Sequence, residues 1–159
     1  MYQYEEFSDG HVLVTHTSKK YRARFRATDA AAASQVVCDL NLPGMLERLA
    51  AHRYEIETQG INIGGMMILT DRESQTQLNA TYTTLNAGFI SSTRWKGPEG
   101  WQTVDITAIE PLAQAVAQHV DKCFQTEESV EIQLRAITDH TEMASFQPEE
   151  EFDAEFAAV

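Results

Sequence analysis

The chain has 159 residues and is 43% hydrophobic, a length and composition that suit one folded core. Its 12 Lys and Arg against 24 Asp and Glu give a formal net charge of −12, which repels nucleic-acid phosphates and anionic lipids. Nucleic-acid binding and membrane-surface binding are therefore disfavoured, and no apolar run reaches the roughly 18 residues of a membrane span.

The first segment, MYQYEEFSDG, lacks the positive and apolar regions of a signal peptide, so we expect the chain to stay in the cytoplasm of its maker. It belongs to an N-terminal region, residues 1–28, that we expect to hold a β-hairpin. HVLVTHT is apolar and β-branched, and after a polar turn the segment YRARFRA alternates strictly between apolar and basic residues.

This alternation places three guanidinium groups in one row on the second strand, because successive strand side chains point to opposite faces. We name it the arginine row; its members are Arg22, Arg24 and Arg26. Three interpretations remain open at this point: a solvated strand face, a protein-docking surface and a phosphate-binding strip, the last of which the acidic composition opposes.

Two helices are predicted next, with a break at residues 41–44. The run TDAAAASQVVCDL begins with a capping residue and stops before Asn41 and the Pro43–Gly44 pair. The run MLERLAAHRYEIET ends before Gly60 and has an amphipathic pattern. Its stripe, at three-and-four spacing, comprises Leu46, Leu49, Ala50, Arg53 and then Ile56 or Glu57. This stripe needs a covering surface.

The segment INIGGMMIL predicts a second hairpin that turns at Gly64–Gly65. Thr70 and Glu73 have capping-box spacing, so we expect them to cap a helix that begins near Asp71, with Ser74 adding a first-turn hydrogen bond. The helix should end around residues 86–88. One of its faces would carry Gln75, Leu78, Tyr82 and Leu85.

A third hairpin should turn at residues 97–100 and bring Trp95 and Trp101 together across its end. The next helix is expected to begin at Thr107, with Glu110 completing a capping box. Its apolar stripe comprises Ile109, Leu112, Ala113, Val116, Ala117, Val120 and Phe124. A last, separate helix is predicted near residues 127–138, with the apolar residues Val130, Leu134 and Ile137.

Residues 141–159 are expected to form an extended acidic arm, because they contain six acidic residues and neither Lys nor Arg. Alone, such a segment buries too little surface to offset its chain entropy. Its natural anchors on a docking surface are Phe146, Phe152 and Phe156. We hypothesise that the arginine row binds the arm, within one chain or between copies, through Glu149, Glu150, Glu151 and Asp153.

The sequence offers no pattern for catalysis, a cofactor or a metal. His119 and Cys123 have the i,i+4 spacing of a shared metal site, but zinc needs three or four ligands, and neither CxxC nor HExxH is present. The glycines near Gly60 match no phosphate loop, and GxSxG is absent. Cys38 and Cys123 suit buried free thiols. We therefore expect no enzyme, no cofactor and no metal ion.

A series of motifs follows in order between residues 44 and 138. They are a helix with Arg53, a hairpin from Gly60 to Gly64, a helix start at Thr70, Asp71 and Ser74, a turn with Trp95 and Lys96, and a helix from Ala115 to Phe124. Together they resemble a domain family of unknown function from phages and prophages. Such domains are often encoded beside tail-fibre genes or attached to fibre and fibre-assembly proteins, and they offer no catalytic residues.

We expect an α+β fold, a single small domain of about five helices with short β-hairpins. Its regions would be the N-terminal hairpin, residues 1–28, a helix and hairpin core, residues 29–140, and the extended acidic arm. The resemblance implies a structural protein of a phage tail, fibre or baseplate that is made in the host cytoplasm and resides in the virion. Its partners would be other tail or fibre proteins, or further copies of itself. The alternatives are a tail-fibre assembly chaperone and a phage-encoded inhibitor of a host defence complex.

Overall fold

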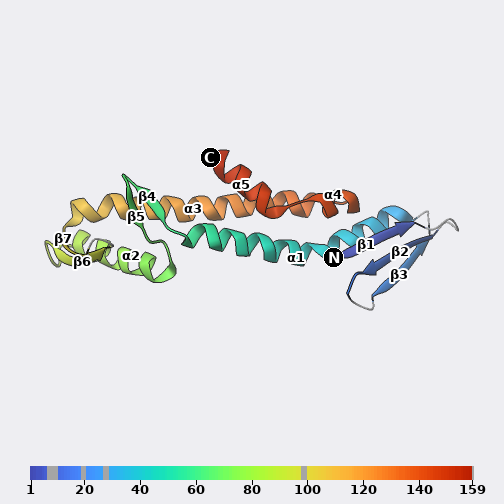
Figure 1. The fold of residues 1–159 in the computed structure, drawn as a ribbon, viewed down its shortest axis with the longest axis horizontal. Coiled ribbons are helices and arrows are strands. Elements are labelled where there is room, and N and C mark those ends of the chain that lie inside the picture. The colour runs from blue at the N-terminus through green and yellow to red at the C-terminus, as the bar shows by residue number, and fades with distance from the viewer. Residues whose placement is uncertain (7–10, 19–20, 27–28, 98–99, 159) are drawn as a thin grey trace. The chain divides into compact units, whose positions relative to one another are not determined.

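The computed structural model describes residues 1–6, 11–18, 21–26, 29–97 and 100–158, and within these ranges it has five α-helices and seven β-strands (Figure 1). All of the strand pairs in these ranges are antiparallel. The expected α+β class is confirmed. None of the described helices combines the length and the apolar character that crossing a membrane requires.

The chain divides into two compact units, which are described separately. Unit 1 comprises residues 1–51 and 126–159, and unit 2 comprises residues 52–125. Two long helices contribute residues to both units: α1, Ala30–Thr58, and α3, Ile106–Ala136.

A three-stranded antiparallel sheet begins unit 1, in the order β1 (Tyr2–Glu6), β2 (His11–His16) and β3 (Arg22–Arg26). The predicted hairpin of β2 and β3 is confirmed. The strand β1 was not predicted, although Tyr2 and Tyr4 alternate with Gln3 and Glu5 and both tyrosines pack on the core of unit 1. This strand pairs with β2 along its whole length and so completes the sheet.

The sheet buries one face against α1 in a cluster of Val12, Val14, Ala33 and Val37. Tyr21 and Ala23 pack on this cluster, whereas Arg22 and Arg24 are exposed on the opposite face. The predicted alternation of β3 is therefore confirmed for these four residues. The side chain of Arg26, the third member of the arginine row, lies outside the described part of the structure.

The single helix α1 occupies the region where two helices are predicted, so the expected break at residues 41–44 is wrong. Pro43 lies within the helix on its exposed side, where water can satisfy the carbonyl that loses a backbone partner. Cys38 and Met45, on either side of the proline, are buried in one core cluster. Asn41 is buried as well, and its side-chain amide binds the backbone of Tyr2 in both directions, at 2.8 and 3.1 Å. Packing on both sides of the proline therefore keeps the helix continuous.

The helix α3 likewise joins two predicted helices into one. The predicted burial of its second apolar run is confirmed, because Val130 and Leu134 are fully buried, as is Ile137 just beyond the helix. The expected cap at Thr107 is wrong. Asp105 is the capping residue, since its carboxylate accepts hydrogen bonds from the Ala108 N–H at 3.1 Å and from the Thr107 hydroxyl at 2.6 Å.

The acidic arm is helical, contrary to the extended conformation that we expect from its sequence. It forms α4, His140–Ser145, and α5, Pro148–Ala158. Asp139 caps α4 by accepting hydrogen bonds from two backbone N–H groups. Met143 and Phe152 are buried within unit 1. Burial of these apolar side chains stabilises helical turns that an isolated acidic segment would not hold.

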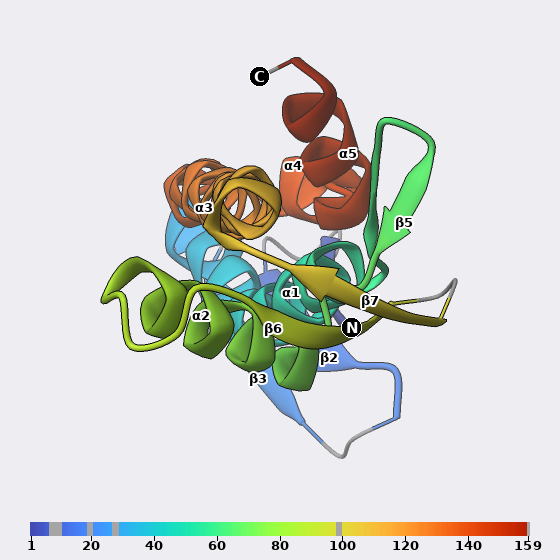
Figure 2. The same ribbon diagram turned by 90° about the vertical axis from the view of Figure 1, so that its left-hand side faces the viewer.

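Unit 2 contains two short hairpins and one helix of its own beside its segments of α1 and α3 (Figure 2). The first hairpin, β4 (Ile61–Ile63) and β5 (Met66–Ile68), turns at Gly64 and Gly65, whose φ angles are 61° and 90°. The predicted hairpin is confirmed. The hydrophobic core of this unit contains the buried residues Leu78, Leu85, Ile109 and Val116.

The helix α2 spans Arg72–Asn86, close to its predicted bounds. Its cap is Asp71, whose side chain accepts hydrogen bonds from the backbone N–H groups of Glu73 and Ser74, at 3.1 and 3.0 Å. The predicted capping box of Thr70 and Glu73 is therefore wrong, because Thr70 is buried and bonded elsewhere. The expected first-turn bond of Ser74 is confirmed, since its hydroxyl donates to Asp71 at 2.6 Å.

The last hairpin, β6 (Thr93–Gly97) and β7 (Gly100–Val104), confirms the predicted hairpin but contradicts the predicted tryptophan pair. Trp95 lies opposite Gln102 and packs on the unit 2 core, whereas Trp101 lies opposite Lys96 and is exposed. The two rings are on opposite faces, because neighbouring positions along a strand alternate.

Candidate functional site

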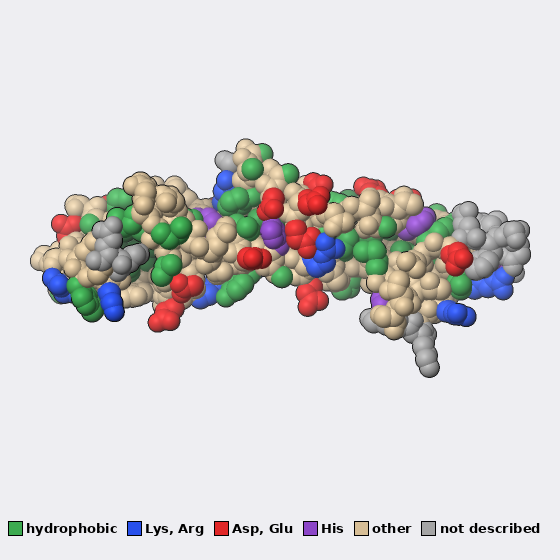
Figure 3. Space-filling view, viewed as in Figure 1, with side chains coloured by type: hydrophobic (Ala, Val, Ile, Leu, Met, Phe, Trp, Pro, Cys, Tyr) green, Lys and Arg blue, Asp and Glu red, His purple; other side chains and the backbone are tan. Residues whose placement is uncertain are grey.

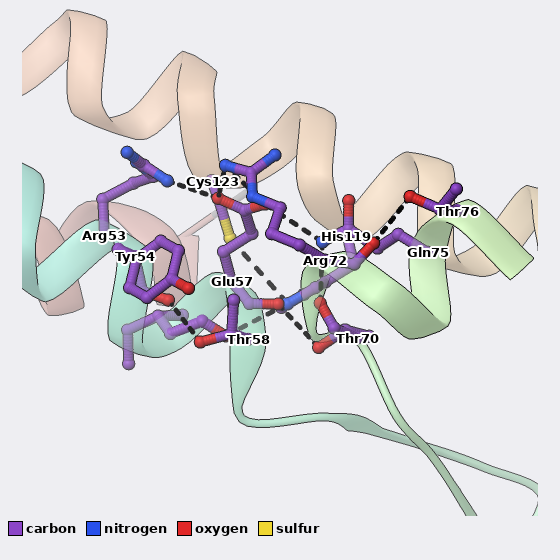
Figure 4. A network of polar contacts seen from close by, with 11 residues as sticks. Arg53, Tyr54, Glu57, Thr58, Thr70, Arg72, Gln75, Thr76, His119 and Cys123 are labelled. Carbon is purple, nitrogen blue, oxygen red and sulfur yellow. Dashed lines mark hydrogen bonds and ion pairs between the residues drawn. The ribbon is translucent and has the colours of Figure 1, made fainter.

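The most deeply buried charge of unit 2 is Glu57, which lies in the last turn of α1 and is 0% exposed. Its carboxylate binds the guanidinium of Arg53 one turn earlier (Figure 4). From α2, Arg72 Nη2 lies 3.1 Å from Oε1, and Gln75 Nε2 donates to the same oxygen at 3.0 Å. A buried charge costs several kcal/mol unless it is paired and hydrogen-bonded. Donors from two helices meet this requirement.

The backbone of the same turn is tied to Thr70. The Thr70 hydroxyl donates to the Glu57 carbonyl at 2.6 Å and accepts the Gly60 N–H at 2.9 Å. Gln75 also donates to the Thr70 carbonyl, at 2.7 Å. The hydroxyl therefore satisfies a carbonyl at a helix end, which would otherwise lack an intrahelical partner. We name this set of contacts the Glu57 network.

Aromatic rings cover the cationic side of the Glu57 network. The Arg53 guanidinium lies 4.5 Å from the centroid of the Phe124 ring and 6.0 Å from that of Tyr54. Arg72 lies 5.9 Å from the Tyr54 centroid. Such contacts attract a cation to the ring face and limit its hydration. Phe124 was expected in the apolar stripe of α3. Its ring is partly exposed and covers the Arg53 guanidinium.

His119 and Cys123 lie beside the Glu57 network, but their geometry is not that of a catalytic pair. His119 Nε2 lies 3.2 Å from the Ile56 carbonyl, and because a carbonyl only accepts, this nitrogen carries the hydrogen. The same nitrogen is 3.9 Å from the Cys123 sulfur and so does not act as a base toward it. Burial, and secondly the charge of Glu57, raises the pKa of the Cys123 thiol to about 11. The thiol is therefore protonated at neutral pH.

The chemistry of the Glu57 network is that of an internal anchor. It links the end of α1, the base of the β4–β5 hairpin and the start of α2, and its polar groups bind one another. Among the residues that the structure describes, no three His, Cys, Asp or Glu side chains are grouped to hold a metal ion. Both cysteines are free and buried, as predicted.

The surface of unit 2 has a different character, because many large apolar side chains are exposed there. Phe89 is 79% exposed and Trp101 is 63% exposed. Among the described residues of this unit, the other large apolar residues that are exposed are Tyr54, Met66, Met67, Leu69, Ile90 and Phe124. Between α2 and α3 lies an open groove of about 660 Å³, lined on its apolar side by Leu78, Val116, Val120 and Phe124. Phe89 and Ile90 are neighbours in the chain, as are Met66 and Met67, and exposed apolar side chains that lie together are typical of interaction surfaces.

The outer face of the β6–β7 hairpin carries two cations beside an exposed tryptophan. We name it the basic–aromatic face and define it as Arg94, Lys96, Trp101 and Thr103. Arg94 donates to the Thr103 hydroxyl at 3.1 Å, and the Lys96 ammonium lies 5.8 Å from the Trp101 ring centroid. Figure 3 shows basic side chains next to hydrophobic ones over this end of unit 2. The sequence motif of Trp95 and Lys96 pointed to this hairpin but not to its outer face.

The two described side chains of the arginine row, Arg22 and Arg24, lie on the solvent face of the β1–β3 sheet. The strand registers place Glu5, Leu13 and Arg24 in one cross-strand row, so an acidic side chain shares this face. The binding of the acidic arm to the arginine row stays a prediction. For Glu149 the structure shows a different partner, since Arg48 of α1 binds its two carboxylate oxygens at 2.8 and 2.6 Å.

The phenylalanines of the acidic arm have an anchoring surface within unit 1. Phe152 is fully buried and its ring stacks on Phe156, with centroids 5.7 Å apart. Phe146 packs on the cluster that contains Met143 and Leu134. Glu150 and Glu151 are exposed on the first turn of α5. The arm therefore presents the carboxylates of Glu150 and Glu151 outward, while its aromatic side chains face the protein.

Sequence reasoning missed Arg48 and Glu57. Arg48 and Glu149 are 101 residues apart, so no local spacing indicates their ion pair. Glu57 left a signal, because it and Arg53 stand among apolar residues on the predicted helix stripe. A charged residue at a position that should be buried indicates a buried ion pair, although its partners on α2 could not be named from the sequence.

A family model described as "Domain of unknown function (DUF4376)" matches residues 43–155, more than two thirds of the chain. The match includes the Glu57 network and the basic–aromatic face, whereas the β1–β3 sheet lies outside it. No curated protein and no solved structure matches the chain.

Proposed function

The chain belongs to the DUF4376 family of domains of unknown function, and we propose that it is a non-enzymatic structural protein of a phage tail, fibre or baseplate that acts by protein–protein binding. The observation that carries the binding role is the group of exposed apolar side chains on unit 2. The tail location rests on the resemblance of residues 44–138 to phage and prophage domains associated with tail fibres.

The difference between the buried polar groups of unit 2 and its exposed aromatic side chains supports a binding role rather than an enzymatic one. The buried Glu57 carboxylate is held by its own neighbours, and the Cys123 thiol has a raised pKa. The surface instead offers large aromatic side chains, Phe89 and Trp101, on the loop and hairpin that follow α2. Aromatic residues on a surface commonly provide the anchor contacts of an interface.

The test is the protein content of purified virions. Mass spectrometry of virions washed at high salt should detect the chain at a constant copy number relative to the major tail protein. A non-structural protein of the same phage is the control for carry-over from the lysate. Absence of the chain from washed virions would overturn the structural role.

A fibre-assembly chaperone is the second candidate, and the exposed side chains of β5 favour it. Met66 and Met67 are exposed on this strand, and Leu69 is exposed just after it. Methionine side chains adapt their shape to different partners, a property suited to transient binding. A chaperone would be recovered with fibre proteins from infected cells and would be lost from mature virions, so the same mass spectrometry separates the two roles.

A further inference from the structure

We propose that the basic–aromatic face of one copy binds the exposed acidic first turn of α5 of a second copy, through the carboxylates of Glu150 and Glu151. This inference deepens the proposed binding role by naming a partner. Its test uses the purified chain alone, so it can fail while the chain is still found in virions.

The basic–aromatic face is suited to a carboxylate partner. Arg94 and Lys96 are both exposed on the β6 strand of the face, and neither β6 nor β7 contains an acidic residue. Trp101, which is 63% exposed, lies beside the Lys96 ammonium and provides an apolar surface. Tryptophan and arginine are among the residues that contribute most to binding at interfaces, where a ring excludes water from neighbouring charges.

The net charge of −12 favours a short acidic segment over a long polyanion as the partner of the basic–aromatic face. A nucleic acid would extend past the face and meet the acidic remainder of the surface, which repels it. At physiological salt, charges are screened beyond about 8 Å. A single helical turn with two carboxylates is short enough to interact mainly with the local positive charge.

The first turn of α5 presents such a segment. Of its three consecutive glutamates, Glu149 is held by Arg48, which leaves its neighbours Glu150 and Glu151 at the exposed positions. The buried Phe152 fixes the helix in unit 1. The carboxylates are therefore presented from a folded helix, and little conformational entropy is lost when they bind.

The arginine row is a less suitable acceptor for this segment. Glu5 shares its solvent face and reduces the local positive charge. Leu13, which lies between Glu5 and Arg24 in the same cross-strand row, is only partly exposed. Among the described residues of this sheet face, Arg22 and Arg24 therefore lack the exposed aromatic surface that accompanies Arg94 and Lys96 on the basic–aromatic face.

Sedimentation velocity of the full chain over a range of concentrations tests the proposal. The wild type should associate, and added salt should weaken the association. The double variants Arg94→Glu/Lys96→Glu and Glu150→Lys/Glu151→Lys should each weaken it about tenfold or more, because each brings like charges together. An equimolar mixture of the two variants should associate again, since the exchanged charges are complementary in both directions.

The matched control is Arg22→Glu/Arg24→Glu, which makes the same change in charge on another exposed strand face and should leave association unchanged. A monomeric wild type at all concentrations would overturn the proposal. So would loss of association in the control with retention in the hairpin variant, which would assign the docking to the arginine row. Binding of a labelled single-stranded oligonucleotide that disappears in the hairpin variant would assign the face to nucleic acid instead. Circular dichroism establishes that each variant is folded, and the restored mixture tests the contact independently of any single variant.

Discussion

Glu57→Ala is expected to destabilise unit 2 strongly, because it removes the carboxylate that holds two arginines. The Arg53 side chain is only 12% exposed and would stay largely buried without this counter-charge, whereas Arg72, at 54% exposed, can regain water. Removing one partner of a buried ion pair costs about 3–5 kcal/mol. The exposure of Arg72 places the expected loss at the lower end, about 3 kcal/mol.

The assay is urea unfolding and thermal unfolding, each followed by circular dichroism, together with hydrogen exchange of the amides in residues 52–125. For a chain of this size, the expected loss lowers Tm by about 6–12 °C. The matched control is Glu131→Ala, which breaks an exposed i,i+4 ion pair with Arg135 in α3 and should cost only about 0.3–0.5 kcal/mol. If Glu57→Ala costs no more than this control, the Glu57 network does not hold unit 2 together.

The other predictions concern four single positions. Gly60 has a φ of 92°, and an added Cβ would lie 3.0 Å from the Ile68 carbonyl, so Gly60→Ala should lose about 1–3 kcal/mol in urea unfolding. Gly44→Ala should instead gain about 0.5–1 kcal/mol, because this helical glycine has open space around it; a loss at Gly44 would contradict the geometry. Cys123 should react slowly with iodoacetamide at neutral pH and faster as pH approaches its pKa of about 11, and rapid labelling of folded protein would refute its burial. The hydrogen bond from Ser74 lowers the pKa of Asp71, so the cap stabilises α2 above the ordinary carboxyl pKa of 3.8 and is lost as pH falls through the lowered value; hydrogen exchange in α2 should show this acid dependence in the wild type but not in Asp71→Asn.

Local patterns identified most strands and the helix α2, because these depend on alternation, turn glycines and one amphipathic face. Both glycine-bounded hairpins of unit 2 are where the sequence predicts them. The helix ends were harder to predict. Pro43 did not end α1, since Cys38 and Met45 on its two sides pack in a shared core. Tertiary burial outweighed the local signal for a break.

The hydrogen-bond partners of the buried polar groups could not be predicted from local spacing either. Thr70 has the spacing of a helix cap, yet its hydroxyl binds the Glu57 carbonyl 13 residues earlier in the chain. Asp71, the next residue, is the cap instead, because its side-chain carboxylate accepts the hydrogen bonds of the first backbone N–H groups of α2. Glu57 and Arg53 lie on the predicted helix stripe. The other partners of Glu57, Arg72 and Gln75, come from α2 and could be identified only from the structure of the hairpin that joins α1 to α2.

The helical acidic arm depends on contacts distant in sequence. Its composition predicts disorder, and the segment is helical where Phe152 is buried and where Arg48 binds Glu149. The sequence indicates Phe152 as an anchor but not the surface that buries it, and no local pattern indicates Arg48 as the partner of Glu149. The exposed Glu150 and Glu151 remain the part of the arm that the sequence marked as acidic and that the fold leaves available for binding.

We propose that the chain is built into a phage tail through the surface of unit 2 that carries its exposed large apolar side chains, and the copy number of variants in virions tests this most directly. Phe89→Ser removes the most exposed apolar side chain of that surface, and Ile132→Ser removes an apolar side chain of unit 1 that is 63% exposed. Quantitative mass spectrometry of purified virions should show a severalfold lower copy number for Phe89→Ser and the wild-type number for Ile132→Ser. Equal incorporation of both variants, or absence of the wild-type chain from virions, would contradict the claim.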